Sequence, residues 1–207
     1  GGGARTFTCD NSPTDVFYHV KIAMGNNKVL TIATGDTLRV ANLLELNNGR
    51  LNGGEVAVEQ ICQVNANWDN GDATLWFVGS ADSFYDFNGA IWEGNNVYIN
   101  KNTSTQTTTI RDIDGDNSVQ IGGNNNNLVI REGILQFEAG VTANLDYGNL
   151  NIEPGGTFSS SNTEVYFQGN YNNSGGTFTH NNGTFIFDGG GGARTFTCDN
   201  SPTDVFY

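Results

Sequence analysis

Residues 1–18 read GGGARTFTCDNSPTDVFY, and residues 190–207 repeat the same eighteen letters. Each copy contains an Arg, a Cys and a Pro, which are uncommon residue types in this chain. Compositional bias does not reproduce such a string, so the sequence is periodic and its period begins again at Gly190. We therefore predict one tandem-repeat unit at residues 1–189, with residues 190–207 as the start of the next repeat.

The repeat predicts that a continuation after Tyr207 would read His-Val-Lys-Ile, as the chain does after Tyr18. An artificial boundary of the sequence or a designed permutant is the alternative explanation. A weaker internal similarity divides the unit into two diverged sub-units, at residues 19–98 and 99–207. It rests on two segments in which a tyrosine follows a phenylalanine at nearly the same spacing, Tyr98 after Phe77 and Tyr207 after Phe187.

The composition favours an all-β fold with many turns. The chain has 207 residues, 37% of them hydrophobic, with 30 Asn and 28 Gly but only 3 Pro. Asn and Gly tolerate left-handed backbone conformations, so they are typical of frequent tight turns. No window carries a helical apolar stripe over three turns.

Net charge excludes some partners. The formal charge is −13, and the nine basic residues are scattered along the chain. Nucleic-acid binding requires clustered Lys and Arg, so we expect no nucleic-acid partner. No apolar run approaches the roughly 18 residues of a membrane span, so we expect no membrane insertion.

Short apolar-x-apolar pairs recur along the chain, as in strands with one buried face. The spacing averages about 21 residues, which gives about nine steps in one period of the repeat. The nine pairs begin at Val20, Leu38, Val56, Leu75, Val97, Val119, Val141, Val165 and Phe185. Because each step contains two or three such pairs, we predict a parallel β-solenoid of about nine coils of ~21 residues.

A β-sandwich repeat is the alternative, because sandwiches also contain many short strands. A sandwich would need a linker between repeats, and the segment 188–192 is the one short candidate. A solenoid passes from one repeat to the next without ending its core. In a solenoid, Asn side chains at successive corners are expected to form amide ladders.

Several segments resemble a known type of repeat. The similar pattern of apolar and polar residues lies in residues 184–187, 17–22, 30–32, 38–40 and 44–51. It resembles the Gly/Asn/Thr-rich tandem repeats of the adhesin-like β-helix regions of large secreted bacterial surface proteins. The resemblance implies a right-handed parallel β-helix, an extracellular or cell-surface location and a role as a stalk, fibre or adhesin body, and it carries over no catalytic residue.

The sharpest local motif is Asp112-Ile-Asp-Gly-Asp-Asn-Ser118. Carboxylates at alternate positions followed by a backbone carbonyl are the first half of a calcium loop. The candidate ligands of a weak Ca²⁺ site are therefore Asp112, Asp114, Asp116 and Ser118. The twelfth position is Gly123 in place of the usual bidentate Glu, and we expect no cofactor to be required.

Two further groups are candidates for contacts. Trp76, Trp92 and Tyr98 could stack on surface glycans or on laterally bundled fibres. The junction between repeats is expected at Phe7, Cys9, Phe17, Tyr18, Phe185, Phe187, Phe196, Cys198, Phe206 and Tyr207. The spacing of Cys9 and Cys62 leaves a disulfide and free thiols equally open.

Catalysis has little support in the sequence. Asp82, Asp86 and Glu93 are near one another, but such residues in Gly/Asn-rich loops are typical of turns. His19 and His180 have no partner at metal or triad spacing. We therefore expect a non-enzymatic protein, a structural repeat unit of an extracellular filament, stalk or fibre, with adjacent copies of the same repeat as partners. An adhesin or carbohydrate-binding module is the alternative.

Overall fold

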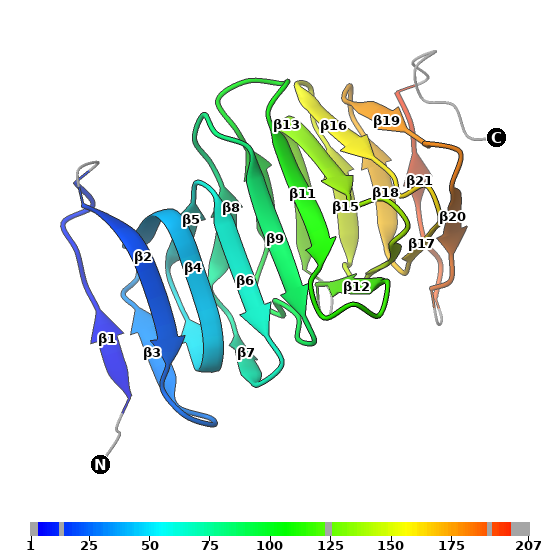
Figure 1. Ribbon diagram of the computed structural model, residues 1–207. Helices are drawn as coiled ribbons and strands as arrows, with labels where there is room; N and C mark the ends of the chain where they lie inside the picture. Colours follow the sequence, from blue (N-terminus) through cyan, green and yellow to red (C-terminus); the bar gives the residue numbers. More distant parts are fainter. Residues whose placement is uncertain (1–3, 13–14, 123–125, 190–191, 200–207) are drawn as a thin grey trace.

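The chain forms one elongated stack of parallel β-coils (Figure 1). The computed structural model describes residues 4–12, 15–122, 126–189 and 192–199. No helix occurs in these segments, and every pairing between their named strands is parallel. The β-solenoid prediction is confirmed, with about eight turns at a spacing of about 22 residues.

Each coil passes through up to three strand positions. The first position contains the start of β2 (Val16–Ala23), the start of β4 (Thr37–Asn52), β5 (Glu55–Val58), β8 (Thr74–Phe77), β10 (Val97–Asn100), the start of β13 (Asn127–Phe137), β15 (Asn149–Ile152), β18 (Asn170–Asn173) and β21 (Phe196–Thr197). The second contains later parts of β2, β4 and β13 with β6 (Ile61–Asn65), β9 (Ser83–Asn88), β11 (Thr107–Asp112), β16 (Gly156–Ser159) and β19 (Thr177–Thr179).

The third position changes sheet along the stack. Its first part contains β1 (Arg5–Phe7), β3 (Val29–Ile32), the end of β4 and β7 (Trp68–Gly71). Its second part is a separate sheet of β12 (Ser118–Ile121), β14 (Thr142–Leu145), β17 (Glu164–Phe167) and β20 (Thr184–Phe187). The predicted sub-unit boundary at residues 98/99 falls inside β10, between these two parts, and stays a prediction.

The apolar pairs line the inside of the coils. In the first position Leu38, Val56, Leu75, Val97 and Leu128 stack in register, and all are buried. Burying such side chains contributes roughly 25 cal/mol per Å² of apolar surface, so each coil is held mainly by the coils on either side.

The nine predicted pairs do not all lie in one position. The pair at Val20 lies in the second position, and those from Leu38 to Val97 lie in the first. The pairs from Val119 onward lie in the third position, where Val119 stacks on Ala143 rather than on Val141. The partner of Val97 in the next coil is therefore Leu128, beyond Val119 in the sequence, because Val119 belongs to β12, in the third position of the same coil as Val97.

Asparagine ladders run along the corners, as predicted. Asn127 donates from Nδ2 to Oδ1 of Asn96 at 2.9 Å, Asn149 donates to Asn127 at 2.6 Å, and Asn170 donates to Asn149 at 2.9 Å. A shorter ladder joins Asn88 to Asn65 and Asn65 to Asn47, both at 2.6 Å. In both ladders the later coil donates to the earlier one, so the hydrogen bonds have one direction along the stack.

Candidate functional site

Exposed apolar side chains gather at the two ends of the stack. Six large hydrophobic residues of the described segments are exposed, and all except Ile113 lie at an end. Val16, Phe17 and Tyr18 of β2 are 40%, 45% and 74% exposed. Phe187 of β20 and Phe196 of β21 are each 49% exposed. Exposed apolar surface with unpaired strand edges is typical of an interaction surface.

The first copy of the duplicated segment forms β1, in the third strand position. Arg5, Thr6 and Phe7 pair in register with Leu30, Thr31 and Ile32 of β3. The carbonyl of Phe7 accepts the backbone N–H of Ala33 at 3.0 Å.

A second set of contacts anchors the same segment after the strand ends. The N–H of Cys9 donates to Oδ2 of Asp36 at 2.9 Å, and the N–H of Thr37 donates to Oδ1 of Asn11 at 2.9 Å. A groove of about 380 Å³ lies beside it, lined by Phe7, Thr8, Cys9, Asp15, Val16 and Phe17.

The second copy forms β21, in the first strand position. Phe196 pairs with Tyr171 of β18, and their rings stack with centroids 4.9 Å apart. The carbonyl of Thr195 accepts the N–H of Tyr171 at 3.0 Å, while the N–H of Thr195 donates to Oδ1 of Asn170 at 2.8 Å. The long asparagine ladder thus ends on this strand. A groove of about 330 Å³ is lined by Phe187, Arg194, Thr195 and Phe196.

The predicted junction residues therefore divide between the two ends. Phe7, Phe185 and Cys198 pack partly buried against the core, Cys9 is half-buried, and the others named above are exposed. Phe206 and Tyr207 lie outside the described residues. Among the described residues, no disulfide joins Cys9, Cys62 or Cys198, and burial raises the pKa of Cys62 well above its ordinary range.

The acidic loop brings its three carboxylates together. One carboxylate oxygen from each of Asp112, Asp114 and Asp116 lies within 4.8 Å of the others. The Asp112 carboxylate also accepts the N–H groups of Asp114, Gly115 and Asn117 at 3.1, 2.9 and 2.6 Å.

These contacts set the charges of the loop. Partial desolvation raises the pKa of Asp112, but the donated N–H groups outweigh it and hold this pKa below its usual value. The hydrogen bond to Asp112 raises the pKa of Asp114. Ser118 donates its N–H to Asp116 at 2.8 Å, and Gly123 lies outside the described residues. The loop is thus shaped by its own hydrogen bonds and offers three carboxylates of the kind Ca²⁺ prefers.

Two of the three predicted contact aromatics form a surface platform. Trp76 and Tyr98 pair in register on β8 and β10, with stacked ring centroids 3.9 Å apart. The guanidinium of Arg131 lies 4.7 Å from the Tyr98 ring centroid and is 3.2 Å from Glu153.

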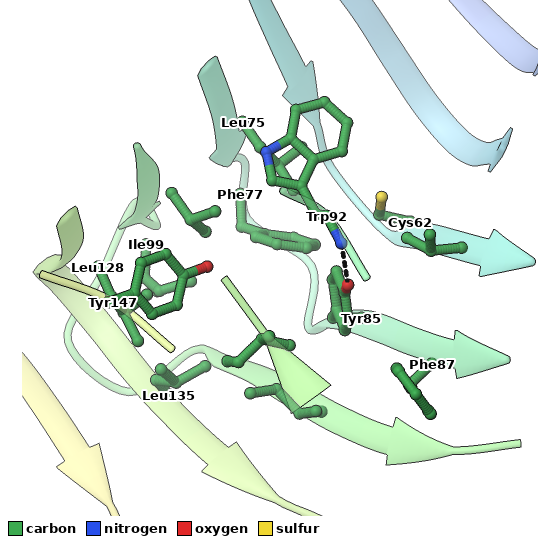
Figure 2. Close-up of a cluster of buried hydrophobic side chains, with 14 of the residues drawn as sticks. Cys62, Leu75, Phe77, Tyr85, Phe87, Trp92, Ile99, Leu128, Leu135 and Tyr147 are labelled. Atoms are coloured by element: carbon green, nitrogen blue, oxygen red, sulfur yellow. Dashed lines mark hydrogen bonds between the residues drawn. The ribbon is translucent and has the colours of Figure 1, made fainter. Parts of the chain in front are cut away.

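Trp92 is a correction, because its side chain is only 2% exposed and cannot contact a glycan or another fibre. Residues 89–96 form no strand in the third position apart from one isolated bridge at Gly89, and Trp92 lies in the core there. Its backbone N–H donates to the Tyr85 hydroxyl at 2.9 Å (Figure 2). A cavity of about 10 Å³, about the size of one water molecule, lies in the core beside Phe77 and Tyr85.

The candidate catalytic carboxylates and histidines all have structural partners. Asp86 binds Arg111 through two contacts of 2.7 Å, and Asp82 accepts the N–H of Thr107 at 2.8 Å. Glu93 accepts from Asn70 at 2.6 Å. His19 lies 3.6 Å from Glu45, and Nδ1 of His180 accepts the N–H of Asn182.

Lys101 is a buried charged residue that sequence reasoning missed. Its side chain is 3% exposed, and Nζ donates to the carbonyls of Val78 and Glu59, which directly follow β8 and β5 of two earlier coils. Burial lowers the pKa of Lys101 to about 8. The one available signal was its position directly after the apolar pair of β10, where the chain leaves the strand.

No protein family, curated protein or solved structure matches this chain. Among the described residues, no helix is long and apolar enough to cross a membrane.

Proposed function

We propose that this chain is a structural unit of an extracellular filament, stalk or fibre, built by end-to-end stacking of β-coils. The observation that carries the proposal is the concentration of exposed apolar side chains at the two ends of the stack. The flanks are closed by strand pairing, whereas each end offers an open parallel edge to another copy. The adjacent partner is another copy of the same unit, in the same chain or in a neighbouring subunit.

Stacking would stabilise the unit through nearest-neighbour interfaces. Each added copy pairs the open edge of the previous one and covers its end aromatics, such as Phe17 and Phe196. The net charge of −13 keeps the flanks of neighbouring filaments apart. This function needs no catalytic residue and no cofactor.

Negative-stain electron microscopy of the purified chain, combined with sedimentation velocity, tests the proposal. We expect thin unbranched filaments whose length increases with protein concentration. A monodisperse monomer at all concentrations, with no filaments on the grid, would contradict it. The extracellular location is tested by immunogold labelling of intact source cells, where label confined to the cell interior would overturn it.

The second candidate function is carbohydrate binding at the platform of Trp76, Tyr98 and Arg131. A stacked aromatic pair beside a guanidinium is a surface on which sugar rings can lie. A glycan array with the intact chain and with Trp76→Ala tests it. Tyr166→Ala is the matched control, because Tyr166 is another half-buried aromatic on an outer strand face. Retention of every bound glycan by Trp76→Ala would exclude the platform.

A further inference from the structure

The two copies of the duplicated strand have the same sequence but pair with different strands. In β1 the strand lies before β3, in the third position, whereas in β21 it lies after β18, in the first position. The side chains are identical in the two copies, so each end site is able to accept either copy. A site that binds Arg5–Phe7 presents the same contacts to residues 194–196.

The two pairings use opposite edges of the strand. The carbonyl of Thr195 faces β18, where it accepts from Tyr171. The carbonyl of Phe7, which corresponds to Phe196, faces β3, where it accepts from Ala33. Successive carbonyls of a β-strand point to opposite edges. One copy of the segment can therefore pair with a β18 on one side and a β3 on the other at the same time.

We propose that a second copy of this chain docks on the C-terminal end with its β3 against β21. In the junction, residues 194–196 of the first copy take the place of Arg5–Phe7 of the second. This inference rests on the proposed function, end-to-end stacking, and names the strand and register that perform it.

The junction turns the second copy by one strand position about the stack. The shared strand is in the first position of the lower copy and in the third position of the upper copy. One period of the repeat therefore comprises about eight turns plus one strand position, not a whole number of turns. The contact is head-to-tail and does not close on itself, so it propagates as a filament.

Docking exchanges the pairing of Arg5–Phe7 with β3 for the identical pairing of residues 194–196 with β3. The free energy that favours docking must therefore come from the surface beside these strands. Phe187 and Phe196 are half exposed beside the C-terminal groove, and Phe17 and Val16 are similarly exposed beside the N-terminal groove. Docking covers both of these apolar surfaces. A covalent tandem array and separate chains would share the same junction.

Disulfide trapping tests the register. Thr195 is expected opposite Thr31 of the second copy, as Thr6 is opposite Thr31 within one chain. Paired Cα atoms about 5 Å apart suit a disulfide. The test variant carries Thr31→Cys and Thr195→Cys with Cys9→Ser and Cys198→Ser. These engineered cysteines lie at opposite ends of the stack, so only contact between copies joins them (Figure 1).

On a non-reducing gel the variant should give a ladder of oligomers that reducing agent removes. The control pair, Val16→Cys with Thr197→Cys in the same background, traps a stack without the turn. A ladder from the control pair alone would overturn the turned junction but leave end-to-end stacking intact. No ladder from either pair, with filaments still visible, would overturn the shared strand. Absence of both ladders and filaments would overturn the proposed function itself.

A synthetic peptide of residues 192–200, with Cys198 replaced by Ser, provides a second readout on the unaltered chain. The peptide should occupy the β3 edge and reduce filament elongation, whereas a scrambled peptide should not. Equal elongation with both peptides would contradict the shared strand.

Discussion

Lys101 is a charged residue whose burial in the stack is unfavourable. Its ammonium is buried between coils and donates to two backbone carbonyls that directly follow strands of earlier coils. Gly133 covers it from the next coil, and a Cβ there would lie 2.7 Å from Cγ of Lys101 and 2.9 Å from the carbonyl oxygen of Gln106. With a φ of +97°, this position also favours glycine.

The stability of the protein should depend on pH through this lysine. Its pKa is about 8 in the folded chain and about 10.5 when unfolded, so between these values the unfolded state binds more protons. The free energy of unfolding should therefore rise from pH 8 to 10.5, by on the order of 2 kcal/mol from this residue. Below pH 8 both states are protonated and the full cost of burial applies.

Denaturant titration at pH 7.5 and 9.5 measures this contribution by comparison with Lys101→Met. The variant lacks the titrating group, so its stability should gain less on going to pH 9.5 than that of the unaltered chain. An equal change in both proteins would show that Lys101 keeps an ordinary pKa when folded.

Asp114 should matter for stability only in the presence of Ca²⁺. Its carboxylate lies close to those of Asp112 and Asp116. The backbone N–H groups of the loop donate to Asp112, so the shape of the loop does not depend on Asp114. Asp114→Ala should therefore lower the melting temperature with Ca²⁺ present and leave it unchanged in chelator. Asp82→Asn, an acidic position in another corner, is the control. An equal loss with and without Ca²⁺ would exclude the site.

At the scale of elements, the corner ladders should contribute measurably to stability. Asn149 donates to Asn127 and accepts from Asn170, so Asn149→Ala removes two hydrogen bonds. The expected loss is about 1–2 kcal/mol, since each such bond contributes about 1 kcal/mol. Asn102→Ala, at an exposed loop position, is the control. Equal stabilities in urea denaturation would show that the ladder is incidental.

Strand existence was predictable because the coils bury alternate side chains, and this alternation is written directly in the sequence. Which strands pair with one another along the stack was not predictable. Val97 and Val119 are separated by about one coil length of sequence, yet they lie in different strand positions, because an apolar pair carries no label for its side of the coil.

Within the candidate site, only the identity of the two duplicated segments gave a clear signal in the sequence. The duplicated ends predicted where the junction lies, and this stays a prediction, whereas the two different neighbours of one strand depend on coil lengths that no local pattern fixes. Trp92 was misassigned as a surface residue because its neighbourhood has no alternation: it lies in a coil segment without a strand there, and tertiary packing alone buries it.

At the scale of the whole molecule, the stack of coils is a directional rod. The strands run parallel, the two asparagine ladders run one way, and the two ends differ in which strand edge they expose. A copy can therefore add in one orientation only. The filament should be polar, with distinct ends that grow at different rates.

The axial rise per copy tests the central claim most directly. Coils about 4.8 Å apart, with about eight turns and one strand position per copy, give a rise of roughly 40 Å. Helical reconstruction from cryo-electron micrographs should yield that rise, with successive copies turned by one strand position. A rise far from this value, or separate beads joined by thin connections, would contradict a continuous solenoid and favour closed domains.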